Sequence, residues 1–485
     1  MGAELDGTDP SSDPQTAKTG RLALLRPLRD RDFRLLWTGM GCSLVGDGVF
    51  LVALAWQVYE LSNAATALSM VGLSMTVPHV LFLLFGGVVS DRTDRRRVMI
   101  AADLVRGALL LLLGILAITD ALRLWHLIVL AAFYGGGTAF FGPAFDSIVP
   151  DIVPSGLLNE ANSLDQFVRP VALRLIGPAL GGWTIAAWGT GPAFLLDAAT
   201  FATSVAATLL MRPRPVPRDE EEGSVVGEIK EGYRFVRDHV WLWGTFAVAT
   251  IAYLLFMGPV EVLLPYVVKN DLGGSARLLG YVFAMGGVGA VGAAAVMGQR
   301  GDTRRPVTFI YIAWALATFA VAGYGAARYP WQVMAASLAF NALETAGTVV
   351  WATMKHRLVP AALLGRVSSF DWFISIGLVP VSFALTAPVA AAIGARATLV
   401  GAGLIGGVVT LAGLCIPGMR AANDSTSWVR ERGRVADDSQ VRERLSEAAD
   451  RANELMALGR LLGPADHLDE DGSGVEEHRR VSRRG

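Results

Sequence analysis

The sequence predicts an all-α polytopic membrane protein, with twelve transmembrane helices arranged as two parallel six-helix halves. Three observations lead to this fold class. The first is composition, because 53% of the 485 residues are hydrophobic, 18% are charged, and the mean hydropathy is +0.45. Soluble domains carry about 25% charged residues. The second observation is a series of long apolar runs, and the third is a repeat that relates the two halves of the chain.

The apolar runs are long enough to be membrane helices, since about 20 mostly apolar residues cross the hydrocarbon core. The runs occupy residues 35–59, 65–89, 98–119, 124–147, 163–187, 192–211, 241–268, 276–298, 306–326, 331–354, 367–391 and 395–418. Several contain proline or glycine, which membrane helices tolerate because neighbouring groups satisfy the freed backbone. We therefore expect twelve spans.

Lys and Arg are distributed unequally between the two sides of these spans. If the N-terminus is inside, the inner segments include the arginines of 92–97 and the basic 212–240 loop, whereas the outer loops carry few basic residues. Positively charged loops remain in the cytoplasm. We therefore expect a multi-pass protein of the cell (plasma) membrane with both termini cytoplasmic and the lipid bilayer as a partner.

The chain divides into five predicted parts. These are a disordered, basic N-terminus (1–34), a six-helix bundle (35–211), a linker with an amphipathic segment (212–240), a second six-helix bundle (241–418) and a tail (419–485). The amphipathic segment carries Val226, Ile229, Tyr233 and Val236 at helical spacing. The tail contains a second amphipathic helix at about 438–462, which could lie on the membrane, pair with a partner or be a soluble appendage.

Two pairs of segments repeat at nearly the same offset. VPSGLLNEANSLDQF (153–167) aligns with VPAALLGRVSSFDWF (359–373), and SDRTDRRR (90–97) aligns with GQRGDTRR (298–305). Both matches run in the same direction along the chain. They predict a duplicated six-helix unit whose two copies have the same orientation.

Two of these segments resemble motifs of the major facilitator superfamily. GGVVSDRTDRRR (86–97) is similar to its loop signature between spans 2 and 3, and GPALGG (177–182) is similar to the end of the antiporter motif. The main positions of the loop signature are held by Gly87, Asp91, Arg92, Arg95 and Arg96, and those of the antiporter-motif helix by Gly177, Pro178, Gly181 and Gly182.

Within the superfamily, the chain resembles the twelve-helix drug–proton antiporters of the macrolide-efflux and enterobactin-exporter type. The shared features are Gly-Asp in the first span, Asp103 with Arg106 in the third, and GRVSS (365–369). The chain departs from the pattern at Asp94 and Leu173, where glycine is usual. It also has no Lys or Arg between Trp125 and Ile148, so the basic motif of the fourth span is missing. The resemblance implies the fold and export, but no substrate.

Ionisable residues deep in a membrane cost several kcal/mol unless they are paired or hydrated, so they suggest function. At 1.5 Å per residue, Asp47, Arg174 and Glu344 lie far from both ends of their spans. We expect Asp47 and Arg174 to pair and to separate when Asp47 takes up a proton; a permanent structural ion pair is the alternative. Glu344 could bind a cationic substrate or a second proton, or form a hydrogen bond with Asn341.

Two further groups of residues are assigned by their positions. Asp91 is expected to cap the helix that follows it, and Asp103 with Arg106 to tie that helix to the 86–97 loop as part of a gate, with a purely structural role as the alternative. A substrate cavity is expected to involve in-span side chains, although some aromatic ones could be interfacial instead. The predicted cavity residues are Trp56, Phe133, Phe140, Asn341 and Trp351.

The functional prediction is a secondary active transporter. We expect no catalytic residues, no metal, and no cofactor other than the proton gradient as energy source, and no Walker motif for ATP is present. The formal net charge of −1 gives no reason to expect nucleic acid as a partner. We expect a monomer, not an enzyme, that performs proton-coupled efflux of a small amphipathic drug, siderophore or secondary metabolite by alternating access. The alternatives are a proton-coupled importer of the same fold and a non-transporting membrane sensor or scaffold.

Overall fold

The computed structural model describes residues 23–154, 157–212, 225–299 and 303–423, and all regular elements in these ranges are helices. Contacts divide the chain into residues 1–427 and 428–485. The second unit, with the amphipathic helix expected at 438–462, lies outside the described residues. The N-terminal segment, expected to be disordered up to residue 34, is helical from Ala23 onward.

Twelve helical segments of the described ranges are long and apolar enough to cross a membrane, which confirms the predicted spans. The first six are α1 (Arg31–Leu61), α2 (Ala65–Arg92), α3 (Arg95–Ile118), α4 (Leu124–Ile152), the α5–η3–α6 segment (Leu158–Arg169, Pro170–Ile176, Gly177–Trp188) and α7 (Thr190–Leu209). The second six are α9–η4 (Val240–Tyr266, Val267–Asp271), α10 (Ala276–Gln299), α11 (Pro306–Ala326), α12 (Pro330–Leu358), α13–α14 (Ala361–Gly377, Val379–Ile393) and α15–η5 (Ala395–Ala412, Gly413–Cys415).

The fifth and eleventh spans are irregular, although regular helices are expected from the sequence. In the fifth span, Pro170 and Pro178 lack the N–H groups that would complete the regular hydrogen-bond pattern, and residues 170–176 form π-helix instead. The N–H of Gly177 donates to the carbonyl of Ala172, five residues earlier. In the eleventh span, α13 ends at Gly377, shortly before Pro380.

Both irregular spans follow the same backbone hydrogen bond. The N–H of Leu157 donates to the carbonyl of Pro154 at 2.8 Å, and that of Leu363 donates to the carbonyl of Pro360 at 2.9 Å. These turns are the Val-Pro positions of the sequence repeat. Pro154 and Leu157 therefore make the same hydrogen bond in the first half as Pro360 and Leu363 make in the second.

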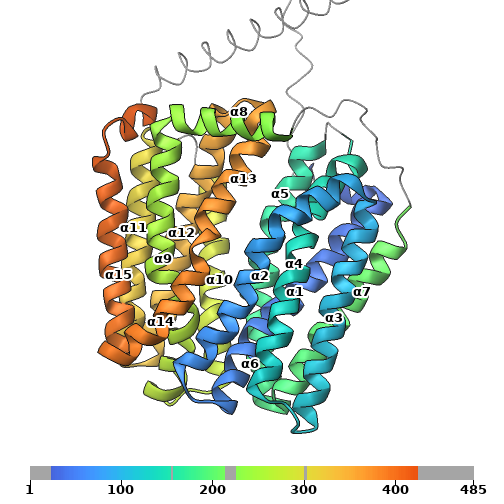
Figure 1. Cartoon of the computed structure of the whole chain (residues 1–485), viewed down its shortest axis with the longest axis vertical. Coiled ribbons are helices and arrows are strands. Elements are labelled where there is room, and N and C mark those ends of the chain that lie inside the picture. Colours follow the sequence, from blue (N-terminus) through green and yellow to red (C-terminus); the bar gives the residue numbers. More distant parts are fainter. Residues whose placement is uncertain (1–22, 155–156, 213–224, 300–302, 424–485) are drawn as a thin grey trace, which may run out of the picture. The chain divides into compact units, whose positions relative to one another are not determined.

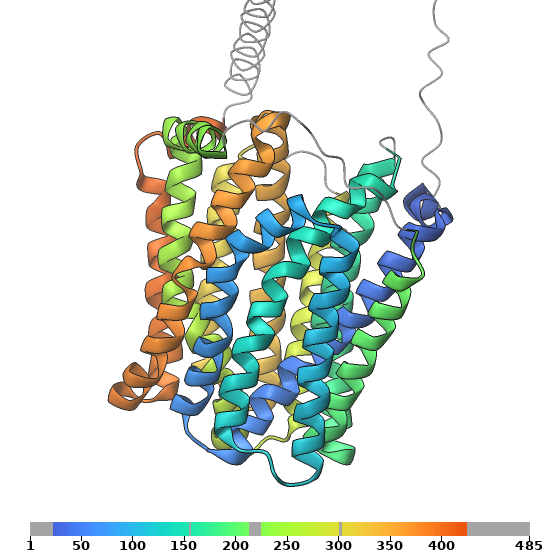
Figure 2. The ribbon, with the colours of Figure 1, turned by 45° about the vertical axis from the view of Figure 1, so that its right-hand side comes forward.

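The helices of each half run side by side, as Figures 1 and 2 show. Between the halves, α2 packs on α14, and η3 with α6 packs on α10. We call the end with the α2–α3 turn and the α4–α5 turn the linker end, and the opposite end, with Ser62–Ala64 and Gly273–Ser275, the distal end. An apolar core shared by both halves includes Tyr59, Val262 and Leu279. A second cluster, within the first half, includes Phe33 and Phe145.

The amphipathic segment of the linker forms α8 (Val225–Asp238), which lies across the linker end of the second half (Figure 1). Its Glu231 pairs with Arg366 of α13 at 2.6 Å. Of the predicted apolar face, Val236 is buried and Tyr233 is exposed, whereas the side chains of Val226 and Ile229 lie outside the described part of the structure. α8 is thus anchored to the second half through α13.

Candidate functional site

A group of ionisable side chains lies inside the first half, and we call it the buried acid cluster. Helices α1, α3, α4 and α7 contribute to it, and Asp47 lies in the middle of α1. Asp103, Arg106 and Asp197 are 1%, 4% and 0% exposed, whereas Asp47 is half-buried. The members of the cluster are Asp47 (α1), Asp103 and Arg106 (α3), Tyr134 (α4) and Asp197 (α7).

Asp47 accepts a hydrogen bond from one side and lies next to a second acid on another. Its carboxylate accepts a hydrogen bond from the hydroxyl of Tyr134, whose ring packs on Phe50 with centroids 4.7 Å apart. The residue before it, Gly46, leaves room for Asp197, since a β-carbon built on Gly46 would lie 2.1 Å from Oδ1 of Asp197. The Gly-Asp pair of α1 therefore brings two carboxyl groups to adjacent positions in the interior.

The arginine of the cluster is enclosed by α3, α4 and α7. Arg106 forms an ion pair with Asp103, and the other oxygen of Asp103 accepts a hydrogen bond from Ser204 at 2.7 Å. The guanidinium carbon lies 4.7 Å and 4.5 Å from the ring centroids of Phe141 and Phe201. The expectation that Asp103 and Arg106 tie α3 to the 86–97 loop is therefore wrong. They lie two to three turns inside the helix, on the face that packs against α4 and α7.

The composition of the cluster limits its protonation. It holds three carboxyl groups and one guanidinium, so it is electrically neutral when two of the carboxyls carry protons. An unpaired charge in such an interior is strongly unfavourable. Oδ2 of Asp197 has no hydrogen-bond partner among the described atoms. No group of His, Cys, Asp and Glu among the described residues is placed to hold a metal ion. The arrangement can take up and release protons.

A second polar contact joins the two halves. Arg174, exposed on η3, donates a hydrogen bond to Oδ1 of Asn341 on α12 at 2.6 Å. The amide of Asn341 donates in turn to the carbonyl of Ser337 at 3.0 Å. Next to this bridge, a β-carbon on Gly287 of α10 would lie 2.5 Å from the carbonyl oxygen of Arg174. The backbones of η3 and α10 are therefore very close together here.

The expected pair between Asp47 and Arg174 is not formed in this structure. The contact between α1 and the fifth span runs through Gly48, which faces the carbonyl of Leu173 and the α-carbon of Gly177. Asp47, one position earlier, faces α4 instead. Arg174 reaches across to the second half.

Glu344 lies one turn after Asn341 on α12 and is half-buried. Its carboxylate accepts a hydrogen bond from Thr348 at 3.1 Å. The alternative of a bond to Asn341 is not realised in this structure, where the amide oxygen of Asn341 accepts from Arg174 and one of its two N–H groups donates to Ser337. Glu344 is therefore close to the bridge without being part of it.

The four residues of the antiporter-motif helix provide close backbone contacts on two sides. Gly177 and Gly181 face α1, where β-carbons would lie 2.7 Å from Cα of Gly48 and 2.9 Å from Cα of Val49. Gly182 faces the second half, where a β-carbon would lie 2.8 Å from the carbonyl oxygen of Ala276 on α10. On α10, a β-carbon at Gly280 would lie 2.5 Å from the carbonyl oxygen of Pro178. The motif thus packs the fifth span tightly between α1 and α10.

A family model described as transmembrane secretion effector matches residues 22–439. The chain belongs to the transmembrane secretion effector family. This membership confirms the resemblance to the drug-efflux type of the major facilitator superfamily, and it agrees with the expectation that the chain is not an enzyme.

Two relatives of similar sequence are efflux proteins by name, and a solved structure of similar fold is a transporter by name. The macrolide efflux protein A of Streptococcus pyogenes is 25% identical over 245 residues, which cover 50% of this chain and 60% of that protein. The multidrug efflux pump Tap of Mycolicibacterium fortuitum is 28% identical over 235 residues, covering 45% and 56%. The chain thus spans about three fifths or less of each relative. The nucleoside transporter NupG has a TM-score of 0.61 at 10% identity, covering 79% of this chain and 98% of NupG. It shares the fold.

In this family member, the loop signature fixes the linker end of α3. Asp94, not Asp91, is the N-cap, and its carboxylate accepts from the N–H of Arg96 at 3.0 Å. The prediction for Asp91 is wrong because α2 continues through Arg92. The side chains of Asp91 and Arg92 and the surroundings of Gly87 lie outside the described part of the structure.

The two described arginines of the loop signature bind helix ends. Arg95 pairs with Asp151 and donates to the carbonyl of Ser147, both on α4. Arg96 donates to the carbonyls of Thr208 and Leu209 at 2.8 and 2.6 Å, at the C-terminus of α7. A cation at a helix C-terminus is favourable because the last carbonyls lack partners. These arginines hold α3, α4 and α7 together at the linker end.

The predicted substrate-cavity residues are not gathered in one place. Trp351 is buried in the second half among the rings of Trp241, Phe246 and Trp314, so its assignment to a cavity is wrong. Phe133 is 61% exposed on α4, and Phe140 packs on Phe82 of α2. Trp56 lies under Lys269 of η4, and Asn341 forms the bridge to Arg174. Two of the five thus lie at contacts between the halves.

Sequence reasoning missed Tyr134 and Asp197. In the sequence, Tyr134 is one of several in-span aromatics, and Asp197 is expected toward the outer face because it lies early in its span. The available signal is Gly46, since a glycine next to an intramembrane acid leaves space for a second side chain.

Proposed function

We propose that this chain exports a small amphipathic compound in exchange for protons, by alternating access of its two halves, with both termini in the cytoplasm. The observation that carries the proposal is the buried acid cluster. Three carboxyl groups around one guanidinium require protons to remain neutral, and a purely structural interior has no need of such a group.

Asp47 is the proposed point of proton exchange. It is half-buried, whereas Asp103 and Asp197 are almost completely buried. Asp103 is already neutralised by Arg106, so the protons are expected on Asp47 and Asp197. Tyr134 holds Asp47 in place for this exchange.

The bridge between Arg174 and Asn341 is the proposed link between the proton site and the movement of the halves. Arg174 belongs to the span that packs on α1 through Gly48, the neighbour of Asp47. A change at Asp47 therefore acts on the helix that carries Arg174. Glu344, next to the bridge, is the proposed contact for a cationic group of the substrate or for a second proton. Arg174 and Glu344 thus complete the coupling set with Asp47.

The chemical class of the substrate is supported by the relatives. Their names include macrolide efflux and multidrug efflux, and the matched regions cover part of each. The proposed substrate site combines the carboxyl group of Glu344 and the guanidinium of Arg174 with the apolar side chains of the spans. Such a site is suited to a compound with both polar and apolar parts.

The test is proton-driven flux by the purified full chain in liposomes, using a panel of amphipathic compounds that includes a macrolide. An imposed pH gradient is expected to drive flux of at least one compound. Asp47→Asn is expected to abolish gradient-driven flux. Asp238→Asn, which changes an exposed acid at the end of α8, is the matched control and is expected to leave flux unchanged.

Two outcomes would contradict the proposal. If no compound responds to the pH gradient, the chain is not a proton-coupled exporter of this class. If Asp47→Asn retains gradient-driven flux while binding the compound normally, Asp47 has no part in coupling.

A further inference from the structure

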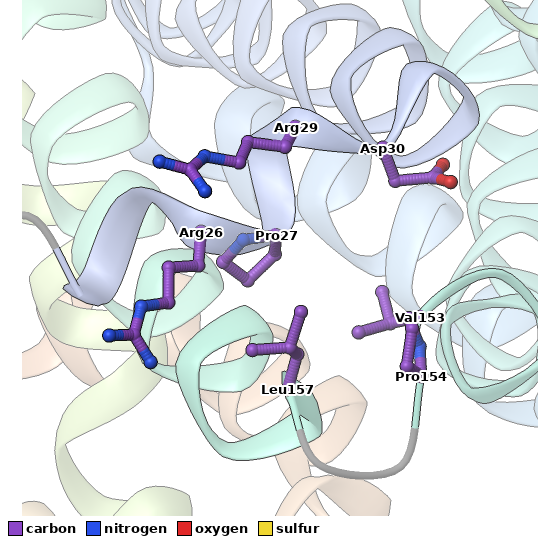
Figure 3. A pocket seen from close by; sticks show the side chains of 7 residues that line it. All are labelled: Arg26, Pro27, Arg29, Asp30, Val153, Pro154 and Leu157. Atoms are coloured by element: carbon purple, nitrogen blue, oxygen red, sulfur yellow. The ribbon is translucent and has the colours of Figure 1, made fainter. Parts of the chain in front are cut away.

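A pocket of about 390 Å³ lies at the linker end of the first half, away from the buried acid cluster and the Arg174 bridge. One wall is η1 (Ala23–Arg29) with the residue that follows it, and the other consists of Val153, Pro154 and Leu157, the described residues on either side of the α4–α5 connection. Figure 3 shows the seven side chains that line it. They are Arg26, Pro27, Arg29, Asp30, Val153, Pro154 and Leu157.

The two arginines of the pocket are brought together by the local backbone. Residues 23–29 form a 3₁₀-helix, in which side chains three positions apart lie directly above one another. The N–H of Asp30 donates to the carbonyl of Pro27 at 3.1 Å, as this geometry requires. Arg26 and Arg29 therefore share one side of η1, and both are exposed.

These two guanidinium groups have no ion-pair partner among the described carboxylates. Asp30 is next in the chain, but its carboxylate caps α1 and accepts from the N–H of Phe33 at 2.9 Å. In Figure 3 it points away from both arginine side chains. Like charges at this spacing repel each other, so an anion bound between them would be stabilising.

Apart from Asp30, the other residues that line the pocket are apolar, and the pocket lies at the start of the first span. Val153 and Pro27 are buried, and Leu157 is half-buried. Asp30 is the N-cap of α1, the first span, so η1 directly precedes a membrane-spanning helix. Leu25, next to the pocket in the chain, is 45% exposed. Basic and apolar groups side by side at this level match the head group and upper acyl chain of a lipid.

We propose that this pocket binds an anionic phospholipid. Arg26 and Arg29 hold the phosphate group, and Pro27, Val153 and Leu157 contact the glycerol and the first acyl carbons. Arginine suits this ligand because its planar fork donates two hydrogen bonds to phosphate oxygens. The proposal does not depend on proton-coupled export, since it concerns other residues and a different ligand.

Native mass spectrometry of the purified full chain tests this assignment. Phosphatidylglycerol and phosphatidylcholine with identical acyl chains are compared, and glycerol phosphate provides the phosphate without acyl chains. We expect phosphatidylglycerol to bind at least about ten-fold more tightly than either of the others. The double change Arg26→Gln and Arg29→Gln is expected to remove this preference.

The matched control is Arg234→Gln with Arg237→Gln, which removes two exposed arginines from α8 at the same end of the molecule. It is expected to keep the preference. Leu157→Trp fills the apolar side of the pocket without changing its charge, and it is expected to weaken lipid binding as well. Equal melting temperatures without lipid show that each variant is folded.

Three results would overturn the proposal. Equal binding of the two phospholipids shows that charge is not recognised. Glycerol phosphate binding as strongly as phosphatidylglycerol shows a site for a soluble phosphate. Equal losses in the η1 and α8 double variants show diffuse attraction to surface charge.

Discussion

Asp47 depends on Tyr134 for its position. The phenol donates to the carboxylate from α4, and its ring is held separately by Phe50, so the hydroxyl can be removed without opening the core. Such a bond contributes about 0.5–1.5 kcal/mol when the acid is protonated and about 1.5–3 kcal/mol when it is charged, and 1.4 kcal/mol corresponds to a factor of ten. We therefore expect Tyr134→Phe to lower proton-driven flux in liposomes about ten-fold or more.

This reduction would occur in a folded protein. The melting temperature of Tyr134→Phe is expected to remain close to that of the parent. Tyr233→Phe, which removes an exposed hydroxyl on α8, serves as the control and should change neither flux nor stability. Flux at the parental rate in Tyr134→Phe would mean that the hydroxyl does not position Asp47 for proton exchange.

The residues of the candidate site were only partly predictable. Asp47, Arg174 and Glu344 are visible in the sequence because ionisable residues in apolar runs are rare. Their partners are not visible in the same way. The identity of the side chain opposite Asp47 depends on which face of α1 packs on α4, and the π-helical turn at 170–176 changes the direction of Arg174.

Among the helices, the fifth span shows how small residues determine packing. Gly182 lies against α10, and a β-carbon there would lie 2.8 Å from a carbonyl oxygen of the second half. Backbone atoms at this distance cannot yield as a flexible side chain can. Alanine normally favours a helix over glycine by about 1 kcal/mol. An alanine in place of Gly182 would therefore stabilise the helix itself but would destabilise the contact between the halves.

We expect Gly182→Ala to lower the melting temperature, because the clash with α10 outweighs the helix preference. The matched control is Gly142→Ala on α4, where a β-carbon has no neighbour within 4 Å. Gly142→Ala should leave the melting temperature unchanged or raise it slightly. If both changes are equally harmless in thermal unfolding, the halves are not in close contact at Gly182.

The number and limits of the helices could be predicted well from apolar runs. The predicted run 306–326 coincides with α11, and most others differ from the helices by a few residues. The π-helical segment of the fifth span and the interruption of the eleventh were not predicted, although the prolines beside them were visible. A proline in a membrane span can bend, widen or interrupt a helix, and its neighbours decide which of these occurs.

In the described part of the molecule, the side-chain hydrogen bonds that join the two halves lie at the Arg174 bridge or at the distal end. At the distal end the hydroxyl of Tyr59 donates to the carbonyl of Val262 at 2.6 Å, and Lys269 donates to the carbonyl of Tyr59. Asn63 and Asn270 are joined at 2.7 Å. The shared apolar core includes this region. The sequence repeat predicted two halves, but it contained no information about which end joins them.

The alternating access that we propose requires these distal contacts to separate during each cycle. We therefore expect flux to stop when the distal end is held closed. Asn63→Cys with Asn270→Cys, in a chain whose Cys42 and Cys415 are replaced by serine, can be joined by a short bis-methanethiosulfonate reagent. Cross-linking should abolish proton-driven flux in liposomes, and a reductant should restore it. Each single cysteine variant, treated in the same way, controls for modification alone. Continued flux by the cross-linked protein would exclude separation of the halves at Asn63 and Asn270, and the bonds of Tyr59 would then be permanent structural contacts.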